Sequence, residues 1–151
     1  MLYFLSLLSG ASLTLSYAPF SYWAVMPIAL TGYLCLLYKA RVDQAAKVGF
    51  SFGLGWFGAG ISWVHVSIAD FGGLPLVGSL GLMLLLCSYL SLYPMIFSKL
   101  AKRYFSPNVW GLALPFVWLL CEWARGIVLT GFPWLSIGYS QMNSPLSGWL
   151  P

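Results

Sequence analysis

The sequence predicts an all-α membrane protein: a bundle of about five transmembrane helices followed by an irregular or re-entrant segment on the outer side. Of the 151 residues, 60% are hydrophobic and 7% are charged, whereas a soluble domain carries roughly 25% charged residues. Several uncharged runs reach the roughly 20 residues that a helix needs to cross the hydrocarbon core of a bilayer. The composition therefore excludes a soluble enzyme, a disordered chain and a disulfide-rich secreted module.

The expected helices follow the uncharged runs, because a run of this length without polar alternation favours a helix over a barrel strand. Proline disfavours helix at the residue before it, so a turn near Pro19 divides the first run into two helices. The five helices are expected at residues 1–17, 21–38, 47–68, 75–98 and 108–130. A lip at residues 131–151 follows, irregular because Gly131, Pro133, Gly138 and Pro145 interrupt it.

The positions of the basic residues predict the orientation. Six of the seven fall into two clusters, between the second and third helices and between the fourth and fifth: Lys39, Arg41 and Lys47, then Lys99, Lys102 and Arg103. Both connections lie on the same side of the membrane by parity, and the positive-inside rule assigns that side to the cytoplasm. We therefore expect a cytoplasmic N-terminus and an outward-facing lip. Two short clusters of this kind make no phosphate-binding face, so nucleic acid is not an expected partner.

Glycines line one face of the helix expected at 47–68, where Gly49, Gly53 and Gly60 coincide at about 100° per residue. Small residues on one stripe let membrane helices pack closely. A groove for a lipid chain is the alternative interpretation.

Glu122 and Arg125 lie three residues apart, so they share a helix face and can form an ion pair. Charges inside the membrane usually face a protein interior or a wet cavity. Two interpretations remain open: a structural pair that fixes the end of the helix, or an anion site in which Arg125 binds a lipid phosphate.

The other reactive side chains predict no catalytic or metal site. Cys35, Cys87 and Cys121 fall inside expected helices and lack metal-ligand spacing. His65 and Asp70, near the outer end of the third helix, form too small a set for a proton pathway. No metal and no cofactor is expected.

Several short motifs resemble the bacterial apolipoprotein N-acyltransferase family. The string LTGFPWL at Leu129–Leu135 and the string GYSQ at Gly138–Gln141 are the most specific of them. Three further pieces occur in the family's order: Ala18-Pro19-Phe20, GISWVHVS at Gly60–Ser67, and EWARG at Glu122–Gly126. The resemblance therefore covers nearly the whole chain.

The resemblance implies a multi-pass protein of the bacterial inner membrane. Such enzymes transfer a fatty acyl chain from a phospholipid donor to the α-amine of the N-terminal diacylglyceryl-cysteine of a lipoprotein acceptor. They do so through a thioester on the cysteine of a Glu-Lys-Cys triad in a periplasmic nitrilase-like domain. This sequence has no lysine after Lys102. We therefore expect an amino-terminal portion of the membrane domain that lacks the nitrilase-like domain and is inactive alone.

Within this portion, the resemblance implies a substrate-binding lip and no catalytic residue. The substrate-binding residues expected are Gly131, Phe132, Pro133 and Trp134, with Arg125 and Glu122 supporting them. Two alternatives from other classes remain. One is a structural membrane subunit, and the other is a small transporter or channel that uses His65, Asp70 and the Glu122–Arg125 pair.

Overall fold

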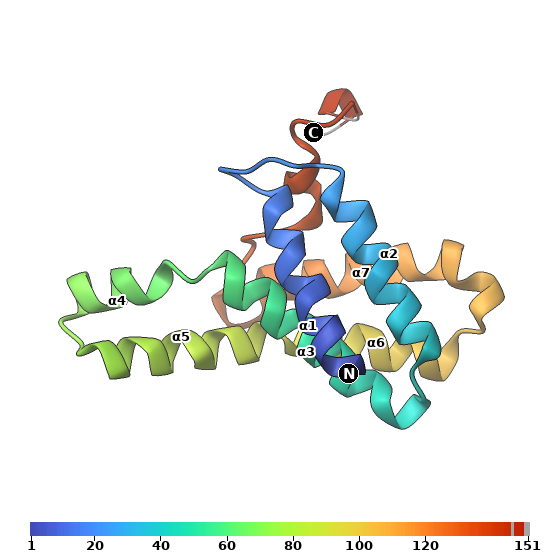
Figure 1. Cartoon of the computed structure of the whole chain (residues 1–151), viewed down its shortest axis with the longest axis horizontal. Helices are drawn as coiled ribbons and strands as arrows, with labels where there is room; N and C mark the ends of the chain where they lie inside the picture. The colour runs from blue at the N-terminus through green and yellow to red at the C-terminus, as the bar shows by residue number, and fades with distance from the viewer. Residues whose placement is uncertain (146, 150–151) are drawn as a thin grey trace.

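The computed structural model describes residues 1–145 and 147–149, and every regular element in these ranges is helical (Figure 1). The α-helices are α1 (Leu2–Leu13), α2 (Val25–Lys39), α3 (Val42–Gly60), α4 (Val64–Gly72), α5 (Leu76–Leu90), α6 (Leu92–Tyr104) and α7 (Trp110–Ile127). Short 3-10 turns include η1 (Thr14–Ser16), η2 (Pro107–Val109), η3 (Val128–Thr130), η4 (Ile137–Gln141) and η5 (Ser147–Trp149). The all-helical class expected from the sequence is confirmed.

The helix expected at 47–68 is instead two elements, α3 and α4, which meet at a bend of 57°. Helix α3 ends at Gly60, and Ile61 leaves the helical region with φ −117° and ψ 21°. The break follows a glycine-rich stretch, where helix propensity is lowest. Hydropathy does not reveal it, because the residues on both sides are apolar.

Helices α5 and α6 form one apolar segment, Leu76–Tyr104, which is longer than the expected 75–98. At 1.5 Å per residue its 29 residues extend about 43 Å, more than the roughly 30 Å of a hydrocarbon core. Among the described residues it is the one helix whose length and composition suffice for a crossing, and the bent pair α3–α4 would be a second. Leu2–Ser16 and Val25–Lys39 are shorter apolar helices.

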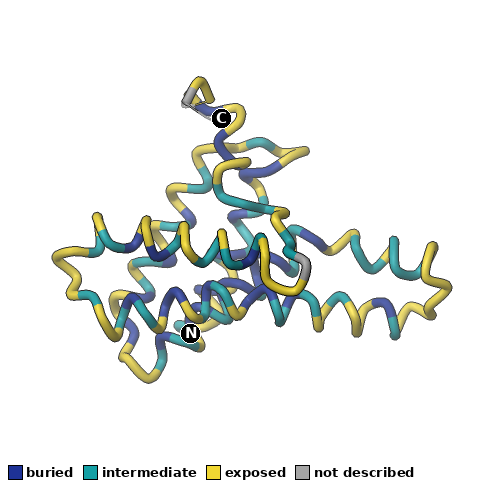
Figure 2. The backbone as a smooth tube through the Cα atoms, turned by 180° about the vertical axis from the view of Figure 1, so that it is seen from behind, coloured by how far each residue is buried: buried dark blue, intermediate teal, exposed yellow. Residues whose placement is uncertain are grey.

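The helices surround a compact centre. In Figure 1, α5 and α6 lie along the long axis, whereas α1 and α2 run steeply across it. Buried positions gather where α1, α3 and α6 meet, and the arm formed by α4 and α5 is largely exposed (Figure 2). The largest buried aromatic side chains at the centre are Tyr33, Phe52, Trp56, Phe57 and Phe97. Much of the exterior is apolar, as expected where lipid replaces water: Phe71 is 92% exposed and Val77 84%.

Glycines allow the central helices to approach closely. A Cβ added at Gly10 of α1 would meet the carbonyl of Phe52 in α3, and one at Gly49 would meet the carbonyl of Pro94 in α6. Gly53 lies against Pro94 of α6 and against Ser91, the residue that joins α5 to α6. The stripe predicted on the third helix therefore packs against protein, which favours close packing over a lipid groove.

Candidate functional site

The lip begins where the chain reverses direction after α7. Leu129 has φ 50° and Gly131 has φ 79°, both in the left-handed region that favours glycine. A Cβ at Gly131 would also collide with the carbonyl of Gly126. The reversal lets the Phe132 N–H donate to the carbonyl of Arg125 at 2.9 Å, so the lip folds back over the end of α7.

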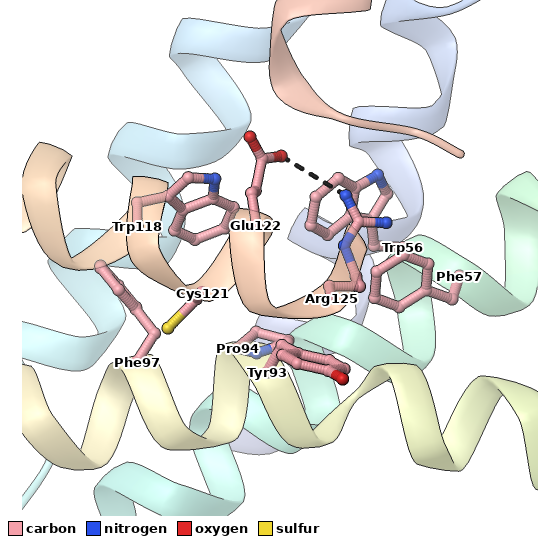
Figure 3. Close-up of a pocket in the computed structure, with 9 residues that line it drawn as sticks. All are labelled: Trp56, Phe57, Tyr93, Pro94, Phe97, Trp118, Cys121, Glu122 and Arg125. Carbon is pink, nitrogen blue, oxygen red and sulfur yellow. Dashed lines mark ion pairs between the residues drawn. The ribbon is translucent and has the colours of Figure 1, made fainter. Parts of the chain in front are cut away.

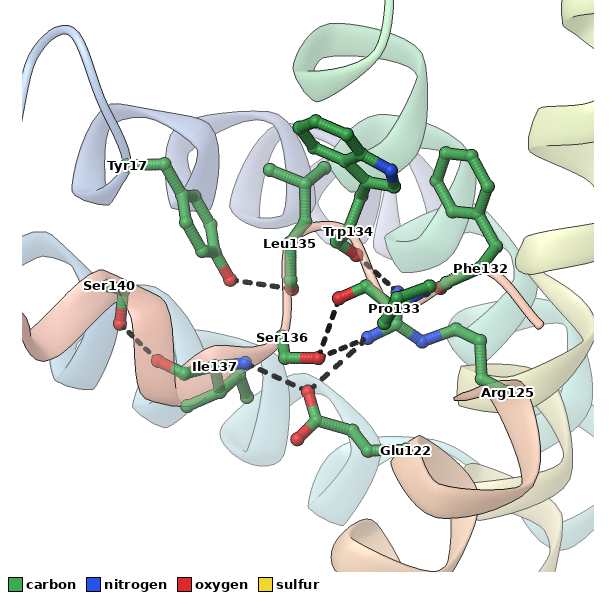
Figure 4. Close-up of polar contacts among 10 residues, drawn as sticks. All are labelled: Tyr17, Glu122, Arg125, Phe132, Pro133, Trp134, Leu135, Ser136, Ile137 and Ser140. Atoms are coloured by element: carbon green, nitrogen blue, oxygen red, sulfur yellow. Dashed lines mark hydrogen bonds and ion pairs between the residues drawn. The ribbon is translucent and has the colours of Figure 1, made fainter. Parts of the chain in front are cut away.

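The side chain of Arg125 hydrogen-bonds to several residues of the lip. Its side chain is 2% exposed, and its guanidinium donates to the carbonyls of Phe132 at 3.3 Å and Trp134 at 2.5 Å (Figure 4). A third donor reaches the hydroxyl of Ser136 at 3.2 Å. The planar, always charged fork suits several fixed acceptors at once. Arg125 therefore fixes the backbone of residues 132–136.

Aromatic rings enclose the same guanidinium. Its central carbon lies 5.3 Å from the ring centroid of Phe57 and 5.7 Å from that of Trp56, both in α3. Cation–π attraction offsets part of the cost of burying the charge, and it grows when the cation is desolvated. Arg125 thereby links α7, the lip and α3.

Glu122 completes the arrangement and confirms the expected pairing. Its Oε1 lies 3.6 Å from Nη2 of Arg125, and the same oxygen accepts the N–H of Ile137 at 2.8 Å (Figure 4). The carboxylate therefore balances the buried cation and also binds the first N–H of η4, where a negative charge is favourable.

Two further hydrogen bonds tie the lip to the turn between α1 and α2. The phenol of Tyr17 donates to the carbonyl of Leu135 at 2.9 Å, and Nε2 of Gln141 donates to the carbonyl of Trp23 at 3.3 Å. The side chain of Leu135 also lies against Gly60, at the end of α3. Each motif that supports the family resemblance therefore has a residue in the lip, in contact with it or next to a contact.

The exposed face of the lip is aromatic. Trp134 is 58% exposed, and its ring lies edge-on to Trp63 with centroids 6.0 Å apart. Pro133 is exposed, and Phe132 and Gly131 are partly buried. Trp134 and Pro133 are therefore the most accessible of these four lip residues.

Beneath the lip the protein is tightly packed. The cavity in Figure 3, between α3, α6 and α7, has a volume of about 10 Å³ and is bordered by Glu122 and Arg125. It holds at most about one water molecule. A larger apolar groove of about 490 Å³ lies between α2, α6 and α7, with Trp118, Glu122 and Ile137 among its walls.

The other candidate residues do not join this site. The ring of His65 hydrogen-bonds the carbonyl of Ser62, and Asp70 lies exposed near the end of α4, on the projecting arm. The three cysteines are free thiols. Among the described residues, no group of three or more His, Cys, Asp or Glu side chains is placed to hold a metal ion.

Sequence reasoning missed Tyr17 and Ser136 as partners of the lip. Tyr17 immediately precedes the Ala18-Pro19-Phe20 motif, and Ser136 immediately follows LTGFPWL. Their position beside the motifs was the available signal. The bond from Tyr17 to Leu135 joins residues 118 positions apart, which one sequence cannot indicate.

The two basic clusters meet at another end of the bundle. Nζ of Lys102 donates to the carbonyl of Tyr38 at 2.8 Å, beside Lys39. Helix α2 begins just after Trp23, which accepts a hydrogen bond from Gln141, and ends at Lys39. Helix α3 begins just after Arg41 and ends at Gly60, beside Leu135. The basic clusters and the lip therefore lie at opposite ends of α2 and α3.

A sequence model described as the N-terminal domain of apolipoprotein N-acyltransferase matches residues 9–151. The chain belongs to this family. It is 47% identical over 146 residues to an apolipoprotein N-acyltransferase of Photobacterium profundum, covering 95% of this chain and 28% of that protein.

Two other apolipoprotein N-acyltransferases are similarly close. The protein of Vibrio cholerae is 45% identical over 145 residues, covering 94% of this chain and 29% of the relative. The protein of Shewanella oneidensis is 47% identical over 150 residues, covering 94% and 28%. The chain thus corresponds to an N-terminal region of the family and spans less than a third of these relatives' length.

Proposed function

We propose that this chain is the membrane-embedded N-terminal part of an enzyme that acylates bacterial lipoproteins. The reaction would move a fatty acyl chain from a phospholipid to the N-terminal diacylglyceryl-cysteine, through a thioester in a nitrilase-like domain of the family. The observation that carries this proposal is the Arg125-held lip, which is built from the motifs of the resemblance. The 151 residues by themselves would be inactive, since no lysine after Lys102 can complete a Glu-Lys-Cys triad.

The substrate-binding residues divide into two groups. Trp134, Phe132, Pro133 and Gly131 would form the surface against which the lipid parts of donor and acceptor pack. Arg125 and Glu122 would hold that surface in place without touching substrate. This division is supported by the hydrogen bonds of Arg125, which are directed at the lip carbonyls and Ser136.

The proposed topology has five crossings in the bacterial inner membrane, with a cytoplasmic N-terminus. It is supported by the contacts that join Lys102 to Tyr38 at one end and Tyr17 to Leu135 at the other. The five spans would be α1, α2, the bent pair α3–α4, the segment α5–α6 and α7. The lip would then face the periplasm.

The test is acyl transfer by a full-length family protein that carries this N-terminal region. Trp134→Ala should lower the rate per folded molecule about ten-fold, because a large exposed aromatic anchor is lost. Trp123→Ala is the matched control, since Trp123 is 64% exposed on α7. If the two variants have the same rate of acyl transfer per folded molecule, the proposed role of the lip is wrong.

A further inference from the structure

We propose that the end of the molecule opposite the lip is a docking surface for anionic phospholipid headgroups. This basic end comprises Lys39, Arg41, Lys47, Lys99, Lys102 and Arg103. The inference does not depend on acyl transfer, because the surface is separated from the lip by the length of α2 and α3.

The charge of this end is strongly positive. Of the three acidic residues in the sequence, only Asp43 belongs to it, which leaves a formal charge of +5. Asp43 pairs with Arg41 at 3.1 Å, so the other cations are not neutralised by it. Lys39, Lys47, Lys99 and Arg103 are exposed. A cluster of this size beside membrane helices attracts anionic lipid.

The fold brings the two clusters together. Lys102 donates to the carbonyl of Tyr38, in the last turn of α2, where the unpaired carbonyls carry partial negative charge. Lys99, Lys102 and Arg103 are three and four residues apart, so they share a face of α6. Because Lys102 binds Tyr38, the neighbouring Lys39 lies beside this face of α6. The basic residues near the α2–α3 connection and those at the end of α6 therefore contribute to one surface.

Aromatic side chains indicate that the occupant is a lipid and not a soluble anion. The ammonium of Lys102 lies 5.6 Å from the ring centroid of Tyr38 and 5.9 Å from that of Trp110. The guanidinium of Arg103 lies 5.8 Å from the ring of Tyr104, which is 67% exposed. Tyrosine and tryptophan prefer the headgroup layer. Phosphate diesters of that layer would meet lysine and arginine donors directly.

The experiment measures lipid binding to the purified intact protein. Phosphatidylglycerol or phosphatidylcholine is titrated into detergent micelles containing the protein, and bound lipid is counted by native mass spectrometry. We expect phosphatidylglycerol to bind more tightly, with a preference that falls as salt rises. The neutralising variant Lys39→Gln/Lys47→Gln/Arg103→Gln should weaken phosphatidylglycerol binding roughly a hundred-fold, at about five-fold per charge.

The matched control keeps the charge: Lys39→Arg/Lys47→Arg/Arg103→Lys should bind phosphatidylglycerol like the parent protein. Lys102 is left unchanged because it holds α2. If the triple neutralising variant does not fold, the single variant Lys47→Gln should still show the loss of about five-fold. Equal binding of the two lipids by the parent, or equal binding by the neutralised and charge-preserving variants, would overturn the proposal. Displacement of the lipid by millimolar inorganic phosphate alone would do the same.

Discussion

The guanidinium of Arg125 donates a 2.5 Å hydrogen bond to the carbonyl of Trp134, nine residues further along the chain. This bond places an exposed tryptophan over the end of a helix, although the intervening residues include a glycine, a proline and a left-handed leucine. Irregular backbone within a membrane protein persists where other groups satisfy its carbonyls. Arg125 does this for the lip, and Glu122 does it for the N–H of Ile137.

Arg125→Ala should lower the free energy of unfolding by about 3 kcal/mol, because it removes charged hydrogen bonds and leaves Glu122 without its buried partner. Thermal unfolding of the purified protein in detergent measures the loss. Arg41→Ala is the control, because the Arg41 side chain is 76% exposed although it pairs with Asp43. This substitution should change the free energy of unfolding by less than about 0.5 kcal/mol. Similar effects of the two substitutions would contradict the role assigned to Arg125.

Tyr17→Phe should destabilise the protein by about 1 kcal/mol, the usual value of one lost neutral hydrogen bond. It should also make the segment 131–141 more sensitive to limited proteolysis, because the bond to Leu135 joins the lip to the turn after α1. Tyr22→Phe, at a tyrosine that is 62% exposed, provides the comparison. An unchanged cleavage rate in Tyr17→Phe would show that the bond does not hold the lip.

Gly10→Ala should destabilise the bundle by about 1–3 kcal/mol, since the new methyl group would meet the carbonyl of Phe52 and force α1 away from α3. Gly58→Ala in α3 is the matched control, because a Cβ there has nothing within 4 Å. That substitution should be neutral or stabilise the helix slightly. The midpoint of thermal unfolding distinguishes them, and equal midpoints would refute close packing as the reason for Gly10.

Much of the fold follows from the sequence because long apolar runs and charged connections obey simple rules. The pairing of Glu122 with Arg125 follows equally directly from their spacing. The bend between Gly60 and Val64 does not, since both sides of it are apolar and the neighbouring Leu135 comes from a distant segment. Local periodicity contains no information about such a contact.

The site was predicted in part. The motif residues of the lip were identified, but the partners that hold it were not. The sequence gives no sign that Trp56 and Phe57 are partners of Arg125, whereas the structure places both rings against its buried guanidinium. That placement depends on how α3 crosses α7, which is set by tertiary packing and not by residue spacing.

The central claim is that the lip and the basic end lie on opposite sides of the membrane. It is tested by labelling with a membrane-impermeant maleimide after replacing the exposed Cys35 by serine. Tyr139→Cys, at a residue of η4 that is 58% exposed, should react in intact spheroplasts. Arg41→Cys should react only after the membrane is permeabilised. Labelling of both positions from the same side, or the reverse pattern, would contradict the account.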